Sequence, residues 1–154
     1  MRINQYALIN NAGYPSLIKE CGVNYPEAVK SPKEIADMMR SLFSIDYKLE
    51  EEFWVICLNT KGKVHGIMSV AKGGYDFCMI DMKSLFTRVL LLGASKIIIC
   101  HNHPSGDCTP SSQDMALTER VKQAAALLEI DLLDHVIVSN KDYYSFKERG
   151  HALS

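Results

Sequence analysis

The sequence predicts an α/β domain in which a mixed sheet is covered by helices. Short apolar segments rich in β-branched residues alternate along the chain with longer segments of helical period. Two of the helical segments begin with residues typical of helix N-termini. The chain has 154 residues, 47% of them hydrophobic and 23% charged, which suffices for one domain with a sizeable core.

Three segments predict helices. The motif "SPKE", which begins at Ser31, combines an N-cap serine, a proline at the first helical position and a glutamate at capping-box spacing. Residues 81–92 form a second helical pattern, which ends at Gly93, a residue type common just beyond a helix C-terminus. Residues 112–130 form the longest helical pattern in the chain.

Five segments predict strands. "FWVICLN" and "VHGIMSVA" flank the turn "TKGK" and indicate a hairpin, which two successive glycines end. "KIIIC" is short, apolar and β-branched, as is typical of a buried strand. In chain order the predicted strands are residues 53–59, 64–71, 96–100, 132–139 and 143–146.

The remaining segments and the overall charge carry weaker signals. Residues 1–30 show little periodicity, so we expect an N-terminal arm or an irregular lead-in, and residues 151–154 form a tail. The net charge of −1 gives no general attraction to nucleic acid. The N-terminus lacks the apolar segment of a signal peptide, and no apolar run approaches the ~18 residues of a membrane span. The five cysteines are scattered without a CxxC pair, which favours free thiols and a cytoplasmic location, with no membrane contact.

The most informative stretch, "CHNHPSGDCTPSSQD", directly follows the buried apolar strand. His101 and His103 are two residues apart, so strand alternation points both imidazoles to one side and Asn102 to the other. Asp114 follows in the first turn of the long predicted helix. Two imidazoles and a carboxylate are ligands that zinc prefers, and three protein ligands leave a fourth position for water, as in catalytic sites. We therefore predict a zinc site with one ion per chain.

A structural explanation of the same residues is also open. Ser111 and Asp114 have the spacing of a helix capping box. A histidine after a buried strand is often a hydrogen-bonded structural residue. The two interpretations are compatible, because an aspartate at a helix start can both cap the helix and bind a metal.

The order H-x-H-P, six residues, S, two residues, D, which runs from His101 to Asp114, resembles the complete metal-binding signature of the JAB/MPN (JAMM) metalloprotease superfamily. The wider string "HNHPSGDCTPSSQD", with "EEFWVICLNTKGK" before it and "LLDHVIVS" after it, is similar to the RadC-like branch. The resemblance covers about residues 31–150. It implies a RadC-like JAB/MPN domain with a three-layer architecture like that of cytidine deaminases.

The resemblance also implies roles for individual residues. His101, His103 and Asp114 take the positions of the zinc ligands. Ser111 takes the position of the serine that helps to stabilise a tetrahedral intermediate. The general base of RadC-like chains lies two residues before the aromatic residue of E-x-F, which selects Glu51 here.

Glu52 is the alternative base if the register of the strand is shifted by one residue. Because side chains alternate along a strand, only one of Glu51 and Glu52 can face the metal. Without the wider motif, both would be interpreted as a solvated acidic pair ahead of a strand.

This sequence departs from the RadC-like pattern in two places. "DMK", from Asp81, stands where such chains generally carry Pro-Arg-Glu, and Cys108 stands where they often have proline. The Cys108 thiol is an inert loop group, a further ligand of the metal or a redox-sensitive contact. Of Asp134 and His135, alternation lets only one face the site, where it either orients a ligand histidine or is a satisfied core residue.

The resemblance implies a zinc-dependent hydrolase that cleaves peptide or isopeptide bonds of a protein or peptide substrate with an activated water. Two alternatives remain: a non-catalytic zinc-bound MPN binding module, and a metal-dependent nuclease or DNA-repair accessory protein. A zinc deaminase is excluded, because neither H-x-E nor P-C-x-x-C is present. A homodimer is a candidate assembly. Its two copies would pair through a hairpin at residues 53–71, which we expect to be exposed, and through the N-terminal arm.

Overall fold

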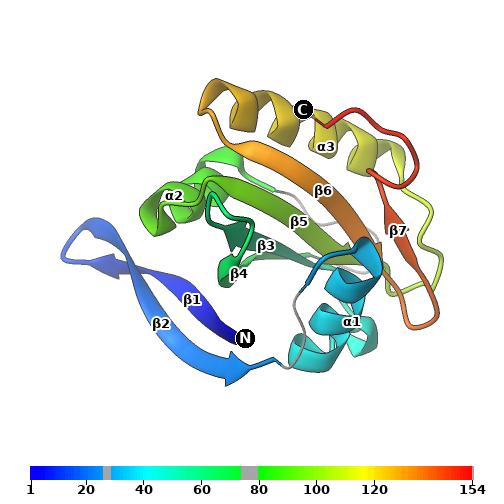
Figure 1. The fold of residues 1–154 in the computed structure, drawn as a ribbon, viewed down its shortest axis with the longest axis horizontal. Coiled ribbons are helices and arrows are strands. Elements are labelled where there is room, and N and C mark those ends of the chain that lie inside the picture. The colour runs from blue at the N-terminus through cyan, green and yellow to red at the C-terminus, as the bar shows by residue number, and fades with distance from the viewer. Residues whose placement is uncertain (26–28, 74–79, 154) are drawn as a thin grey trace.

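The computed structural model describes residues 1–25, 29–73 and 80–153 (Figure 1). These residues form seven strands and three α-helices, so the predicted α/β class is confirmed. The strands are β1 (Arg2–Asn11), β2 (Tyr14–Asn24), β3 (Glu52–Leu58), β4 (Val64–Lys72), β5 (Lys96–Asn102), β6 (Asp131–Val138) and β7 (Tyr143–Ser145). The helices are α1 (Pro32–Phe43), α2 (Met82–Leu92) and α3 (Ser112–Leu127), and a short 3-10 helix spans Ile45–Tyr47.

The strands form one mixed sheet in the order β2-β1-β4-β3-β5-β6-β7. Neighbouring strands are antiparallel, except for the parallel pairs β1–β4 and β5–β6. The β3–β4 hairpin was expected to be exposed. That expectation is wrong, because β1 and β5 flank this hairpin and the sheet ends instead at β2 and β7.

Side-chain alternation along β3 divides the core between the two faces of the sheet. Phe53 and Val55 belong to a buried cluster that includes side chains of α2 and α3. Trp54 and Ile56 belong to a second cluster that includes side chains of α1. The fold therefore has three layers, with α1 on one face of the sheet and α2 and α3 on the other (Figure 1). We call these the α1 face and the α3 face.

The predicted helix signals are present in the structure. Ser31 and Glu34 form the capping box of α1. Asp81, which departs from the RadC-like pattern, caps α2 by accepting a hydrogen bond from the Lys83 N–H at 3.1 Å. Gly93 ends α2 with a left-handed backbone conformation, at a φ of 71°.

The helix α3 ends at Leu127, earlier than the predicted end at residue 130. Glu129 has a positive φ of 58°. The N–H groups of Glu129 and Ile130 donate to the carbonyls of Ala126 and Ala125, which is the Schellman pattern of helix termination. Glycine usually occupies the left-handed position of this motif, so a glutamate there leaves no local signal in the sequence.

The N-terminal segment differs most from the prediction. Residues 1–30 were expected to be an arm or an irregular lead-in, but they contain β1 and β2, which pair as a hairpin. At its turn Ala12 and Gly13 have positive φ, and the Gly13 N–H donates to Asn10 Oδ1 at 2.8 Å. Most side chains of this hairpin are half-buried or exposed, so it lacks the apolar alternation of a core strand. In Figure 1 its turn lies at the opposite end of the molecule from β7.

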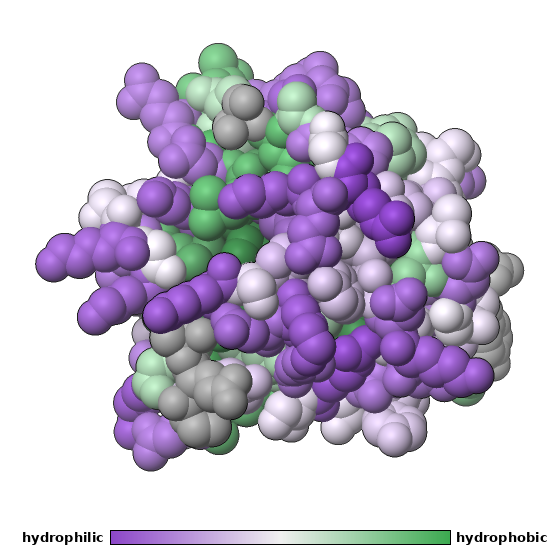
Figure 2. All heavy atoms as spheres, turned by 45° about the vertical axis from the view of Figure 1, so that its right-hand side comes forward, coloured by the Kyte–Doolittle hydropathy of each residue, from purple (hydrophilic) through white to green (hydrophobic). Residues whose placement is uncertain are grey.

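The surface drawn in Figure 2 is mostly hydrophilic, and a smaller group of hydrophobic side chains lies toward its upper left. Within the part of the chain that the structure describes, no helix combines the length and apolar character needed to span a membrane.

Candidate metal centre

His101 and His103 lie at the end of β5. His101 pairs with Phe53 of β3 and is only 2% exposed. Just after the strand, the His103 N–H donates to the Val138 carbonyl of β6 at 3.0 Å, which holds the chain close to that neighbouring strand. The two imidazoles come together as predicted, while Asn102 between them makes its hydrogen bonds elsewhere.

Asp114 reaches the same point from the first turn of α3. The Ser111 Oγ accepts from the Asp114 N–H at 3.0 Å, and Asp114 Oδ2 accepts from the Ser111 N–H at 2.9 Å. The predicted capping box is therefore formed. It orients the carboxylate, whose oxygens also contact both histidines.

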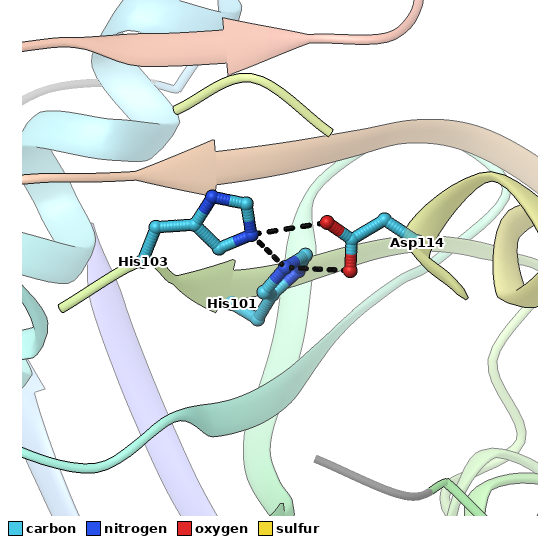
Figure 3. Close-up of side chains that lie close together, drawn as sticks. All are labelled: His101, His103 and Asp114. Carbon is cyan, nitrogen blue, oxygen red and sulfur yellow. Dashed lines mark hydrogen bonds and ion pairs between the residues drawn. The ribbon is translucent and has the colours of Figure 1, made fainter. Parts of the chain in front are cut away.

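The three side chains converge on one point (Figure 3). The Nε2 atoms of His101 and His103 are 3.0 Å apart. Asp114 Oδ2 lies 3.0 Å from His103 Nε2, and Asp114 Oδ1 lies 3.2 Å from His101 Nε2. All the potential ligand atoms lie within 4.8 Å of one another. A tetrahedral zinc ion with bonds of about 2.0–2.1 Å separates its ligand atoms by roughly 3.3 Å, so these residues fit an ion after a small outward shift.

Burial and hydrogen bonds set the charge of this group. Burial lowers the pKa of His101 and favours its neutral form. Burial also acts to lower the pKa of His103, but hydrogen bonds to Asp114 and to the Asp107 carbonyl outweigh it and raise that pKa. Burial opposes ionisation of Asp114, yet its close contacts with the two histidines and the hydrogen bond from the Ser111 N–H hold the pKa of the carboxyl well below its usual range. The carboxylate is therefore ionised at neutral pH, as cation binding requires.

The orientation of the His103 ring is fixed by the loop that follows it. His103 Nδ1 lies 2.7 Å from the Asp107 carbonyl oxygen, which can only accept a hydrogen bond. Nδ1 must therefore carry the proton, which in the neutral ring leaves the lone pair on Nε2, toward His101 and Asp114. This is the tautomer that a metal ligand needs.

The two candidate glutamates lie in different surroundings. Glu51 is 6% exposed and lines a cleft together with His103 and Ser111. The Glu52 carboxylate instead accepts a hydrogen bond at 3.3 Å from Nε1 of Trp54, whose side chain belongs to the α1-face cluster. The structure therefore brings Glu51 to the candidate metal centre and leaves Glu52 away from it.

Asn102 holds the backbone around Glu51, a contact that the sequence alone did not indicate. Its side chain is buried, with Oδ1 accepting from the Glu52 N–H at 2.7 Å and Nδ2 donating to the Glu50 carbonyl at 3.1 Å. The Gly73 N–H also donates to the Glu51 carbonyl at 2.9 Å. The residue between the two histidines thus connects β5 to the segment that carries Glu51.

Other polar residues of the motif have structural partners. The Cys108 thiol donates to the Asp142 carbonyl at 3.3 Å and does not belong to the His-His-Asp group. Asp134 accepts hydrogen bonds from the Ser145 hydroxyl at 2.6 Å and from backbone N–H groups. Of the Asp134–His135 pair, it is His135 that contacts the candidate ligand His101.

The fold and the site together define a JAB domain with a group that can hold a metal. The family model described as RadC-like JAB domain matches residues 29–151, and the chain belongs to this family. Similar relatives include the UPF0758 proteins of Clostridium beijerinckii (37% identical over 128 residues, 83% of this chain), Clostridium novyi (40% over 122 residues, 79%) and Thermotoga maritima (38% over 125 residues, 81%).

The matched regions cover 55%, 53% and 55% of these three relatives. The chain therefore spans about half the length of the curated relatives that it matches. Activities of a whole relative do not transfer to it directly.

Proposed function

We propose that this protein is a zinc-dependent hydrolase of peptide or isopeptide bonds. The observation that carries the proposal is that Glu51 and Ser111 line one cleft with His103, directly beside the His-His-Asp group. A general base, a hydroxyl donor and a metal ligand then border the same space, which is the arrangement that amide hydrolysis needs.

His101, His103 and Asp114 are the residues that would hold the zinc. Zinc bound there would supply Lewis acidity and lower the pKa of a water molecule at the open coordination position. The choice of zinc follows from the donor set, because two imidazole nitrogens and one carboxylate suit zinc better than magnesium or calcium.

Glu51 would move the protons of the reaction. Its carboxylate takes a proton from the attacking water and delivers it to the nitrogen of the leaving amine. Asn102 holds the backbone on both sides of Glu51, through a buried hydrogen bond from the Glu52 N–H and a half-buried one to the Glu50 carbonyl.

Ser111 would stabilise the negative charge that develops on the carbonyl oxygen. Its Oγ already accepts a hydrogen bond from the Asp114 N–H, which orients the hydroxyl and leaves its own proton to donate. One such donor typically contributes about 3–4 kcal/mol to the transition state.

The test compares Glu51→Gln with Glu52→Gln in zinc-loaded protein, on a panel of peptides and of peptides branched through a lysine side chain. Both changes remove a buried carboxylate and keep its shape. We expect Glu51→Gln to reduce cleavage by about 10²-fold or more, because it removes the base. Glu52→Gln should retain most of the wild-type rate.

Equal losses in both variants would contradict the role of Glu51. No cleavage of any substrate by zinc-loaded wild type would contradict the hydrolase and favour the binding module. Phosphodiester cleavage abolished by Asp114→Ala would favour the nuclease instead. The cytoplasmic location and the homodimer stay predictions.

A further inference from the structure

His135 contacts the metal centre from a neighbouring strand. It pairs with Ile99 in the parallel β5–β6 ladder, and its side chain is fully buried. Its Nε2 lies 2.8 Å from His101 Nδ1, on the side of the His101 ring opposite the ligand nitrogen. Its own ring stacks on Phe146, with centroids 4.7 Å apart and an interplanar angle of 7°.

Thr118 of α3 determines which nitrogen of His135 carries the proton. The Thr118 Oγ1 lies 2.7 Å from the Asp114 carbonyl oxygen and 2.6 Å from His135 Nδ1. A threonine hydroxyl has one proton, and a carbonyl oxygen can only accept. Thr118 therefore donates to Asp114 and accepts from the Nδ1–H of His135.

The same assignment of donors and acceptors fixes the proton of His101. A neutral His135 with its proton on Nδ1 has only a lone pair on Nε2, so His101 must donate its Nδ1–H to that atom. His101 then keeps its lone pair on Nε2, which faces His103 and Asp114. Each of these hydrogen bonds is shielded from solvent, because every side chain in the series is buried.

We propose that Thr118 and His135 are positioning residues that lock His101 in its metal-binding tautomer, through hydrogen bonds that begin at the backbone carbonyl of the ligand Asp114. This inference rests on the proposed function, because it requires the metal centre. It adds how the protein prepares His101 to bind the ion. These contacts join α3, β6 and β5. The helix that carries Asp114 therefore also determines which nitrogen of His101 carries the proton. Groups that orient a ligand histidine in this way raise metal affinity without touching the ion.

The experiment measures zinc affinity by competition with a chromophoric chelator, for wild type, Thr118→Val and His135→Phe. Valine keeps the shape of threonine without its oxygen, and phenylalanine keeps an aromatic ring against Phe146. Each variant should bind zinc about 10–100-fold more weakly. His135→Gln should recover part of the loss, because its amide can accept from His101 and donate to Thr118.

Thr87→Val is the matched control. The Thr87 hydroxyl makes the same bond to the carbonyl four residues earlier, at 2.7 Å, but on the exposed side of α2. Its removal should leave zinc affinity unchanged. Unfolding curves of all the variants identify any that fail to fold.

Nitrogen-15 NMR of the imidazoles in zinc-free protein gives a second readout. In wild type the proton of His101 should lie on Nδ1, and in Thr118→Val this single tautomer should give way to a mixture. Wild-type zinc affinity and an unchanged His101 tautomer in folded Thr118→Val would overturn the proposal. Absence of zinc binding by wild type would count against the proposed hydrolase, and the NMR result would then decide the tautomer lock by itself.

Discussion

Asn102 lies between two candidate metal ligands in the sequence, but its side chain contacts a different part of the site. His101 and His103 contact each other and Asp114, whereas Asn102 binds the backbone on both sides of Glu51. Three successive residues therefore set the ligand positions and the base position together. A change at the middle residue should affect the base without removing a ligand.

Asn102→Ala should lower the free energy of unfolding by about 2–4 kcal/mol, because it leaves the buried Glu52 N–H without a partner and also removes the half-buried bond to the Glu50 carbonyl. Urea denaturation measures this change. The control is Asn59→Ala, which also removes two side-chain bonds to the backbone, here both accepted from N–H groups at 3.0 and 3.1 Å, but in an exposed turn. The control should lower the free energy of unfolding by about 1 kcal/mol. An equal loss in both variants would show that the Asn102 side chain does not hold the backbone around Glu51.

At the residue scale, sequence reasoning reached the three candidate ligands because they fall in one short stretch. The resemblance selected Glu51 over Glu52, and the structure adds the strand register through the Phe53–His101 pair. Sequence reasoning left open whether Asp134 or His135 orients a ligand histidine, and it gave no signal that Thr118 joins His135 beside His101. Thr118 and His135 come from a helix and a strand whose contacts depend on the tertiary fold, and neither forms a local pattern with His101.

At the scale of elements, the N-terminus of α3 has two tasks. The Ser111–Asp114 capping box satisfies backbone N–H groups, as the Ser31–Glu34 box does in α1. In α3 the same aspartate also contacts both histidines, and the same serine lines the cleft with Glu51. The Ser31–Glu34 box lies on the other face of the sheet from α3, so it serves as a matched control.

Ser31→Ala and Ser111→Ala should therefore cost similar stability, about 1 kcal/mol each, measured by urea denaturation. Their effects on hydrolysis should differ. Ser111→Ala should slow cleavage by about 10²–10³-fold through loss of the hydroxyl donor, whereas Ser31→Ala should leave the rate at the wild-type value. Comparable rates for the two variants would show that the serine of α3 only caps its helix.

Element boundaries were predictable where a local signal marks them. Ser31 and Gly93 mark helix ends that the structure confirms. The end of α3 carries no such signal, because Glu129 adopts the left-handed conformation without being a glycine. The β1–β2 hairpin was missed because its strands do not sort apolar and polar side chains between two faces.

At the scale of the whole molecule, the strand order assembles the site. β5 lies between β3 and β6, so Glu51 approaches from one side of the histidines and His135 from the other, while α3 supplies Asp114 and Thr118. The sequence predicts the α/β class from its alternating elements. It does not predict this order, because pairing between distant strands depends on tertiary contacts rather than on local pattern.

The most direct test of the account is the zinc content of purified, tag-free protein prepared without chelator, measured by mass spectrometry beside His103→Ala. The account predicts about one zinc per chain in wild type, and none in the folded variant, since His103 is one of the three candidate ligands. A well-folded wild type that binds no zinc, or a His103→Ala variant that keeps it, would contradict the metal centre on which the proposed function rests.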